Sequence, residues 1–461
     1  MKARKSMKKR FVSLLVALSI TLTFLPIGAV AAAPIKFTDG NLKYTVNADG
    51  QSVTVFGTSG SPTHLTIESS ISDGNGKSYT VTKIGEWAFN KCNSLTEVTI
   101  PNTVIEIDHQ AFYYCSNLKK VTIHEGVKTI GPTAFIGCTQ LTSITIPSTI
   151  TDMDQAFSGN TALSHVTLTN GISNISNMAF NGCTGLTEIK VPISVVQICP
   201  GAFNGCTNLK RVLLEKNIKK ININAFKDCT ELNDVKYNGY KTDWDKVTVN
   251  KTGNDTLTRK VQYLCDINFD LNGGTINGSD TMATQTVYSN EKLGTAKCYP
   301  NDQPFVVPTD PVREGYTFLG WYTQAEGGIK YTFTEAVSSN ITLYAHWNAH
   351  SHTVTLENDE NKKTNSYDYG SSVSVPTPTK KTGYNFNHWE VTVPDGETAP
   401  SLNGPDENGN YSFSMPDYDI TLTAKWTQKD VIDPDVDLKF DAATGEVTSN
   451  NPQVNADDII N

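Results

Sequence analysis

Apolar and small residues recur along residues 84–250 with a period of about 23 residues. An Ala-Phe pair occurs seven times, and successive pairs are 23, 23, 22, 23, 23 and 23 residues apart. Three residues after each Phe stands a Cys, replaced once by Asn160, and three residues further stands a Leu. An alternating apolar and polar run follows each Leu, which is the pattern of a half-buried strand. The period predicts a solenoid of stacked coils.

The repeated letters predict the core of this solenoid. One short coil cannot bury its own apolar face, so neighbouring coils must stack. Because stacked strands lie about 4.8 Å apart, each repeated apolar letter becomes a column through the molecule. A second apolar pair in each coil, such as Val127 and Ile130, is expected to line the opposite wall. One coil is a residue short in "TDMDQAF", and we expect its loop to absorb the loss without breaking the columns. The seven Phe are Phe89, Phe112, Phe135, Phe157, Phe180, Phe203 and Phe226.

The pattern AFxxCxxLxxVxIPxxVxxI resembles the BspA-type leucine-rich repeats of bacterial surface proteins. The resemblance implies a curved parallel β-solenoid. Residues 32–83 contain "LKYTVNADGQSVTVFG", which predicts a hairpin, and they resemble the capping segment that precedes such arrays. The stretch "YNGYKTDWDKVTVN" resembles a closing segment after the last repeat. Terminal coils need such caps because their end faces are otherwise open.

Two further modules are predicted at residues 261–348 and 352–428. The first contains "FDLNGGT", "EGYTFLGWYTQAEGG" and "ITLYAHW", and it resembles the Listeria–Bacteroides repeat, a small β-grasp-like module of internalin-type surface proteins. The second contains "TGYNFNHWEV" and "YSFSMPDYDITLTAKW", and it resembles a related bacterial surface repeat. Each module has two Trp, which we expect in its core because aromatic residues bury the most area. A carbohydrate-stacking platform is the alternative. The fold class expected for the whole chain is mainly β.

The two ends of the chain differ in charge from the rest. Residues 1–31 have a basic start, an apolar stretch and an A-x-A pattern ending at Ala31, which predicts a cleaved signal peptide and export. An uncleaved membrane anchor is the alternative, and no later segment is apolar enough to span a bilayer. Removal of six Lys and Arg with the leader changes the net charge from −9 to −15, which argues against nucleic-acid binding. Residues 429–461 are acidic and predict a flexible tail.

The cysteines, the histidines and a search for catalytic motifs indicate whether the chain binds metals or catalyses a reaction. Six of the nine Cys occupy one solenoid column, so we expect them to be free and buried, with Asn160 as a turn-capping substitute. No CxxC spacing occurs, which disfavours zinc. Cys199, Cys265 and Cys298 lie outside the column and receive no role. The eight His are scattered, and no HExxH, GxSxG or phosphate loop occurs. No catalytic residue, cofactor or metal site is predicted, and the chain is not expected to be an enzyme.

The outward positions of the predicted strands form the expected binding surface, here called the strand face. A flat, rigid face of this kind binds macromolecules by area. We expect an exported, monomeric, adhesin-like protein of the cell surface or the medium that binds a host or bacterial protein or glycan. The alternatives are a spacer that presents another domain, and carbohydrate binding through the Trp-containing modules. The candidate binding residues are Thr99, Lys120, Thr122, Thr145, His165, Thr167, Lys190, Arg211, Leu213 and Lys236.

Overall fold

The structure is a computed structural model that describes residues 34–359, 361–429, 438–440 and 447–449. The predicted signal peptide and most of the predicted acidic tail lie outside these residues. The chain divides into two compact units. The first comprises residues 34–235 and 246–261, and the second comprises residues 236–245 and those from 262 onward. Almost all regular structure is β, so the predicted fold class is confirmed.

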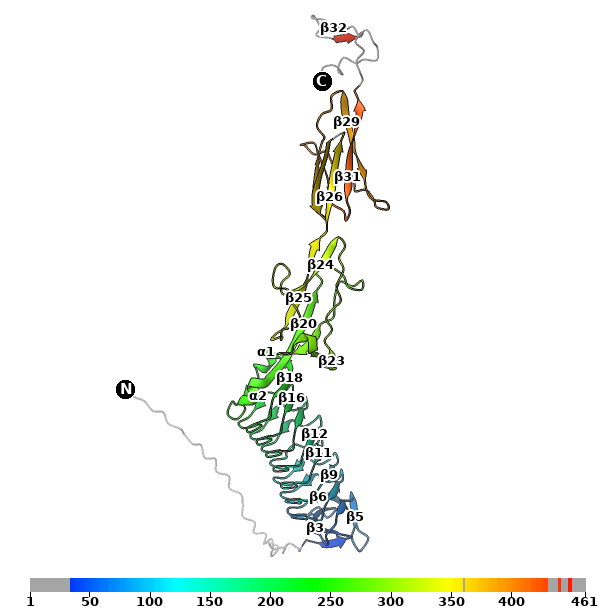
Figure 1. Ribbon diagram of the computed structural model, residues 1–461. Helices are drawn as coiled ribbons and strands as arrows, with labels where there is room; N and C mark the ends of the chain where they lie inside the picture. The colour runs from blue at the N-terminus through cyan, green and yellow to red at the C-terminus, as the bar shows by residue number, and fades with distance from the viewer. Residues whose placement is uncertain (1–33, 360, 430–437, 441–446, 450–461) are drawn as a thin grey trace, which may run out of the picture. The chain divides into compact units, whose positions relative to one another are not determined.

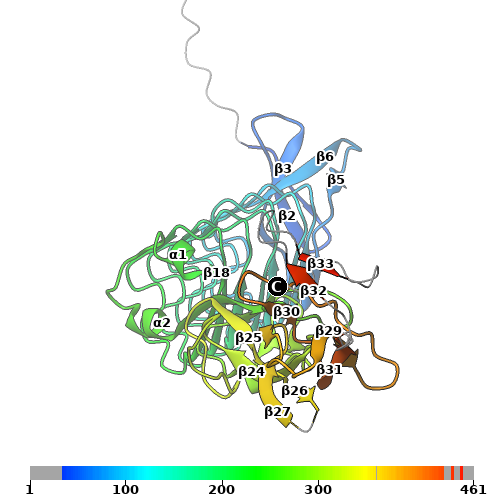
Figure 2. The same ribbon diagram turned by 90° about the horizontal axis from the view of Figure 1, so that it is seen from above.

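The first unit is a solenoid in which successive coils pair in parallel (Figures 1 and 2). Most coils contribute one four-residue strand to a long-strand wall and one two-residue strand to a short-strand wall. The ladders join residues one repeat apart, such as Glu97 with Lys120. Strand alternation then turns Val98 and Ile100 into the core and leaves Thr99 outside.

The strands of this unit fall into three groups. The long-strand wall has β4 (His64–Thr66), β7 (Glu97–Ile100), β9 (Lys120–Ile123), β11 (Ser143–Ile146), β12 (His165–Leu168), β14 (Glu188–Val191) and β16 (Arg211–Glu215). The short-strand wall has β8 (Glu106–Ile107), β10 (Thr129–Ile130), β13 (Asn174–Ile175), β15 (Gln197–Ile198), β17 (Lys220–Ile221) and β19 (Thr248–Val249). The cap has β1 (Lys36–Asp39), β2 (Leu42–Val46), β3 (Ser52–Thr58), β5 (Ser70–Ser72) and β6 (Ser78–Ile84), and the helix α2 (Asp255–Lys260) follows β19. The predicted hairpin is confirmed as β2 and β3.

The predicted aromatic column is confirmed. All seven Phe are at most 2% exposed. Neighbouring rings stack with centroids between 4.9 Å and 5.7 Å apart. The Ala before each Phe is buried, which leaves room for the ring column. Val127 and Ile130 are buried on the opposite wall, as the pattern predicted.

The cysteine column makes regular contacts between coils. Each buried thiol donates to the carbonyl oxygen of the Phe in the preceding coil, for example Cys115 Sγ to Phe89 O at 3.0 Å and Cys183 Sγ to Phe157 O at 3.2 Å. All nine cysteines are free, so this part of the prediction is confirmed. The prediction of burial is wrong for Cys92, which lies half-buried in the first coil.

The short coil interrupts both walls. In place of a two-residue strand it has a single bridge between Thr129 and Asp152. The short-strand wall therefore divides after β10, and the long-strand wall divides between β12 and β14. Phe157 stays in the column, so the apolar columns survive the lost residue as expected. The ladder between β11 and β12 also spans the lost residue in full register, whereas the ladder is interrupted one coil later, between β12 and β14.

Asn160 fills the cysteine position of this short coil. Its side chain is fully buried, and neither amide atom has a hydrogen-bond partner among the described residues. The prediction that Asn160 caps a turn is therefore wrong. The flanking coils satisfy the same position with a thiol that donates to a carbonyl, as in Cys138 and Cys183.

The second unit contains two β modules. The first has β20 (Val261–Asp270), β21 (Gln285–Tyr288), the 3-10 turn η1 (Leu293–Thr295), β22 (Lys297–Cys298), β23 (Gln303–Pro304), β24 (Tyr316–Tyr322) and β25 (Ile341–Ala349). The second has β26 (Ser351–Asn358), β27 (Asn361–Asp368), β28 (Ser372–Pro376), β29 (Tyr384–Thr392), β30 (Asn410–Ser414) and β31 (Ile420–Gln428). The remaining elements are β18 (Asp234–Tyr240), α1 (Lys241–Trp244), and the paired strands β32 (Leu438–Phe440) and β33 (Val447–Ser449).

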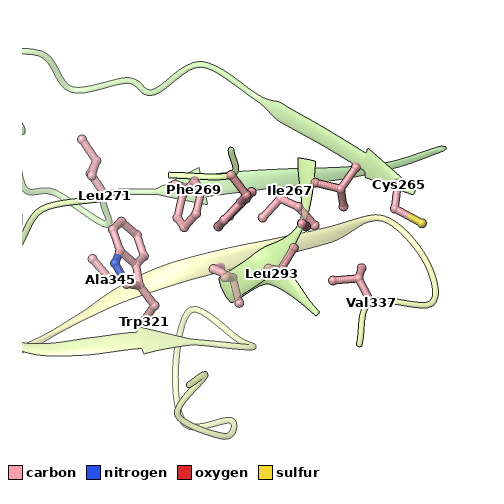
Figure 3. Packing of buried hydrophobic residues seen from close by; sticks show 12 residues of the cluster. Cys265, Ile267, Phe269, Leu271, Leu293, Trp321, Val337 and Ala345 are labelled. Carbon is pink, nitrogen blue, oxygen red and sulfur yellow. The ribbon is translucent and has the colours of Figure 1, made fainter. Parts of the chain in front are cut away.

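The two modules share one strand arrangement. In each, the first strand pairs in parallel with the last, β20 with β25 and β26 with β31. In each, the last strand also pairs antiparallel with a strand that carries an irregularity just before its Trp. Trp321 and Trp389 are 4% and 5% exposed and lie in the two cores. Figure 3 shows Trp321 beside Phe269 and Ala345 in the first core. The expectation that the Trp residues fill the cores is confirmed for Trp321 and Trp389, whereas Trp347 and Trp426 are only partly buried against the cores.

Candidate binding surfaces

The predicted strand face forms aligned rows on the long-strand wall. The ladders place Thr99 beside Thr122. They also place Thr145 beside Thr167, and Lys190 beside Leu213. Their neighbours Lys120, His165 and Arg211 lie on the same wall and are exposed. The rows are hydroxyl-rich and, apart from Leu213, polar; the binding role of these ten residues remains a prediction.

The charges of the strand face neutralise one another. Lys120 Nζ lies 2.6 Å from Glu97 Oε1, and this contact holds the pKa of Glu97 below its usual value. Arg211 lies between two carboxylates, with Nε 2.6 Å from Asp234 Oδ2 and Nη1 3.4 Å from Glu188 Oε2. Exposed pairs of this kind add little stability, typically under 1 kcal/mol. They neutralise Lys120 and Arg211, whereas the neighbouring Lys190 is exposed.

Lys236, the last predicted binding residue, is held by neighbours in the second unit. Its ammonium lies 3.1 Å from Glu291 Oε1 and 4.2 Å from the centre of the Tyr288 ring. The side chain is 20% exposed. A partner that recruits Lys236 must therefore compete with an ion pair and a cation–π contact.

A second surface of the solenoid lies on the turns that carry the Ala-Phe pairs, and we call it the aromatic edge. It consists of Trp87, His109, Tyr113 and Tyr114, from two successive coils. The Trp87 ring stacks on the His109 ring, with their centroids 6.1 Å apart, and meets the Tyr113 ring in a T-shaped arrangement at a centroid distance of 5.9 Å. The centroids of the Tyr113 and Tyr114 rings lie 4.6 Å apart. Trp87 and Tyr114 are 45% and 49% exposed, so their rings are open to solvent.

The backbone under the aromatic edge is costly for large residues. In each coil the residue before Ala and the residue before the cysteine position have positive φ, and Trp87 (φ 60°) and Tyr114 (φ 55°) occupy these positions. Before the cysteine position four other coils have glycine, for example Gly137, whereas before Ala only Gly201 is glycine and residues such as Thr133 adopt the same positive φ. The left-handed region costs a non-glycine residue roughly 1–2 kcal/mol. Two aromatic residues are thus held where glycine fits the backbone better.

The coil ladder explains why the conformation persists. The amide of Trp87 donates to His109 O at 3.3 Å, and the amide of Tyr114 donates to Ile136 O at 2.8 Å. The Tyr114 ring also covers Gly137 of the next coil, where a Cβ atom would meet it at 3.0 Å. The sequence analysis missed this edge because "EWAF" and "AFYY" lie at variable positions. The signal was that aromatic letters occur there in only two adjacent repeats.

The two modules also have aromatic side chains that are only partly buried. Trp426 is half-buried against the second core, and it lines a hollow of about 570 Å³ with Phe386, Tyr384 and Lys381. Lys381 Nζ lies 4.5 Å from the centre of the Tyr384 ring. Trp347 packs against the first core and donates its indole N–H to Leu271 O at 3.1 Å.

The fold also gathers groups that the sequence separates. His350 and His352 lie beside Asp417, and these three are the one group of potential metal ligands found within the described residues. The sequence analysis predicted no metal site because it treated the histidines as dispersed. The unused signal was the His-x-His spacing in "NAHSHTV". No helix among the described residues has the length and apolar character needed to cross a membrane.

Comparison with known proteins agrees with this architecture. Residues 70–155 and 153–249 match the BspA type leucine rich repeat region in six copies. Residues 266–346 match the Listeria-Bacteroides repeat domain, and residues 352–430 match the divergent InlB B-repeat domain. The resemblances predicted from the sequence are therefore confirmed.

Individual relatives match only part of the chain. Internalin H of Listeria monocytogenes is 30% identical over 190 residues, which are 41% of this chain and 31% of internalin H. A leucine-rich repeat protein of T. pallidum is 27% identical with a TM-score of 0.38, covering 42% of this chain and 88% of that one. A leucine-rich repeat protein of Bacteroides capillosus is 35% identical with a TM-score of 0.28, and the match covers 29% of this chain and 99% of that one. The chain spans less than a third of the curated relatives that it matches.

Proposed function

We propose that this chain, which joins a BspA-type leucine-rich repeat region to a Listeria-Bacteroides repeat domain and a divergent InlB B-repeat domain, is an exported binding protein of the bacterial surface. Its solenoid binds a protein of a host or a neighbouring cell. The coarse role, protein binding at a surface, follows from the repeat families and the internalin relative. The predicted leader supports export.

The aromatic edge is the observation that carries the proposal. Trp and Tyr are enriched among the few interface residues that supply most of the binding energy, because each buries a large rigid surface. Here Trp87 and Tyr114 stay exposed and lie in one cluster with His109 and Tyr113. Tyr114 also occupies a position of positive φ that four other coils fill with glycine. We therefore place the centre of the interface on this edge.

The strand face supplies the outer contacts in this proposal. Rigid walls of Thr and paired charges bind through area and shape, and each side chain contributes little. The exposed Lys190 would help to exclude partners of the wrong charge. The expected interface thus has an aromatic centre and a polar surround, as stable protein complexes do.

An array of extracellular-matrix proteins, host surface proteins and glycans tests the proposal. The probe is the tag-free chain from residue 32. A protein hit is then measured against an edge variant, Trp87→Gly with Tyr114→Gly. A strand-face variant, with Lys190, Arg211, Leu213 and Lys236 changed to Thr, serves for comparison. We expect the edge variant to bind about 30-fold more weakly, as the loss of a hot spot implies. The strand-face variant should bind a few-fold more weakly, with nearly unchanged melting temperatures for both.

Three results would contradict the proposal. A protein hit that binds both variants like the wild-type chain would exclude the solenoid surfaces. Hits confined to glycans that are lost on Trp426→Ala would favour the module hollow as a carbohydrate site. The hollow beside Trp426 and Tyr384 is the feature that supports that second candidate. No hit of either class would favour a spacer that presents another domain.

A further inference from the structure

His350, His352 and Asp417 converge where the two modules of the second unit are joined in the chain. Asp417 Oδ1 lies 2.7 Å from His350 Nδ1 and 2.8 Å from His352 Nε2. The ligand atoms of all three residues lie within 4.8 Å of one another. All three side chains are partly exposed, with 37%, 22% and 35% of their surface open. Solvent can therefore reach the cluster.

The backbone explains the convergence. His350 directly precedes β26, and His352 is its second residue. In an extended chain residues two apart lie on the same side, so both imidazoles face one way. Strand β26 pairs in parallel with β31, with Val354 opposite Ile420, which brings the loop before β31 alongside the two histidines. The amide of Thr353 donates to Asp419 Oδ1 at 2.7 Å and fixes that loop.

The other nitrogen of each histidine lies near an oxygen atom. His350 Nε2 lies 3.1 Å from Thr317 Oγ1, within hydrogen-bond distance, and His352 Nδ1 lies 3.8 Å from Asp419 Oδ1, which is too long for a hydrogen bond. Histidines that bind metals almost always donate their second N–H to a carboxylate or another oxygen, which fixes the tautomer and aims the free nitrogen at the ion. His350 has such an outer partner in Thr317, and His352 has the Asp419 carboxylate nearby at 3.8 Å. Both inner nitrogens lie within 2.8 Å of Asp417 Oδ1.

We propose that His350, His352 and Asp417 bind one divalent transition-metal ion of the Zn²⁺, Co²⁺ and Ni²⁺ class. Two imidazoles and one carboxylate are donors that suit these ions, whereas Ca²⁺ and Mg²⁺ require sites made of oxygen atoms. Zn–N and Zn–O bonds of about 2.1 Å in tetrahedral geometry separate ligand atoms by about 3.4 Å. The two contacts to Asp417, at 2.7 Å and 2.8 Å, therefore need to lengthen by only about 0.7 Å. Water completes the coordination on the open side.

The surroundings favour a cation. Asp417 lines a hollow of about 540 Å³ together with Glu314 and Glu397, and Asp419 lies behind His352. A bound ion would connect the segment between the modules to the loop before β31. Through His350 and Thr317 it would also involve β24 of the first module.

Zinc titration of the tag-free chain tests the site. The chain is stripped with a chelator, and Zn²⁺ binding is measured by calorimetry, with Co²⁺ absorption as a second readout of coordination. We expect one equivalent to bind, with at least tenfold weaker binding in His350→Ala, His352→Ala and Asp417→Asn. The matched control is His388→Ala, a histidine exposed on β29 in the same module, which should bind zinc like the wild-type chain.

Melting curves in chelator separate loss of ligands from loss of fold. A variant that melts like the wild-type chain without zinc, yet is no longer stabilised by zinc, supports the site. The proposal is overturned if the wild-type chain binds zinc no more tightly than the chain lacking both histidines. It is also overturned if His388→Ala weakens binding as much as His352→Ala.

Discussion

The solenoid and the two modules place their large aromatic residues in opposite ways. In the modules Trp321 and Trp389 are buried and close a small core. In the solenoid the Phe column fills the interior, and Trp87 and Tyr114 are left on the outside. The difference arises from how each region builds its core. A module has one core and needs its largest side chains there, whereas a solenoid shares its core among seven similar coils.

This comparison indicates where function can vary. In the solenoid the columns fix only the repeated letters, so the remaining positions of each coil are free to carry binding residues. In the modules the distinctive Trp residues are already used for stability. A surface Trp in a repeat is therefore stronger evidence for binding than a Trp in a small module, which most often fills the core.

Alkaline pH should lower the free energy of unfolding of the solenoid more than that of the modules, and this is the largest difference that we expect between the two regions. Burial raises the pKa of Cys115, Cys183 and Cys229 to about 12 and that of Cys138 and Cys206 well above its usual value. Because these thiols ionise at lower pH in the unfolded chain, stability falls as the pH rises above about 9. At pH 10 the loss is roughly 1.5–2 kcal/mol per thiol, or several kcal/mol for the solenoid.

Pulse proteolysis in urea with reductant, at pH 7.5 and pH 10, measures this loss region by region when fragments are identified by mass spectrometry. The first module should lose less, because its buried thiol is Cys265, whose pKa burial raises to about 11. The second module contains no cysteine and serves as the internal control. Equal losses in the solenoid and the second module would contradict the cysteine column.

Core substitutions should act locally in each region. Phe180→Ala and Trp389→Ala each remove a buried ring and should cost about 3–5 kcal/mol. Phe180 stacks on rings of both neighbouring coils, so its loss should weaken the solenoid and spare the second module. Trp389→Ala should weaken the second module and spare the solenoid. The same pulse-proteolysis measurement detects the effects of both substitutions. An unchanged solenoid midpoint for Phe180→Ala would rule out the stacked column.

Replacing Asn160 by Cys should stabilise the short coil. The buried amide has no partner among the described residues, and an unsatisfied buried polar group costs about 1–3 kcal/mol. A thiol at this position can donate to the carbonyl of Phe135, as Cys138 does to that of Phe112. We expect the urea midpoint of the solenoid to rise, while Asn90→Cys, an exposed control, leaves it unchanged. A lower midpoint for Asn160→Cys would show that the amide is satisfied.

The smallest effect is expected at the aromatic edge. Tyr114→Gly removes the left-handed strain but also the ring that covers Gly137, so stability should stay equal or rise by up to about 1 kcal/mol. Gly182→Ala introduces strain at the equivalent position of another coil and should cost about 1 kcal/mol. Thermal melting compares the two. A large loss for Tyr114→Gly would mean that the ring serves stability.

The sequence predicted what repeats and missed what depends on neighbours in space. The Phe and Cys columns follow from period alone, because any stack in register must superimpose identical letters. The broken ladders at Asp152 and the unsatisfied Asn160 depend on how one deletion shifts the backbone between coils. The pairing of Lys236 with Glu291 joins residues far apart in the sequence.

The candidate sites divide in the same way. The strand face follows from alternation, and its rows were placed correctly in register, although their binding role remains a prediction. The aromatic edge needs the stacking of two coils before Trp87 and Tyr113 meet. The His350, His352 and Asp417 cluster needs the parallel pairing of β26 with β31, which the sequence pattern does not specify.

Hydroxyl-radical footprinting of the chain with its array-identified partner tests the central claim, that the solenoid binds through its aromatic edge. The label reports solvent exposure at each Trp and Tyr, so edge and modules are read in one experiment. We expect strong protection of Trp87 and Tyr114 in the complex and unchanged labelling of Trp347 and Trp426. Unchanged labelling of Trp87 and Tyr114, with protection of Trp426, would contradict the account and move the binding site to the second module.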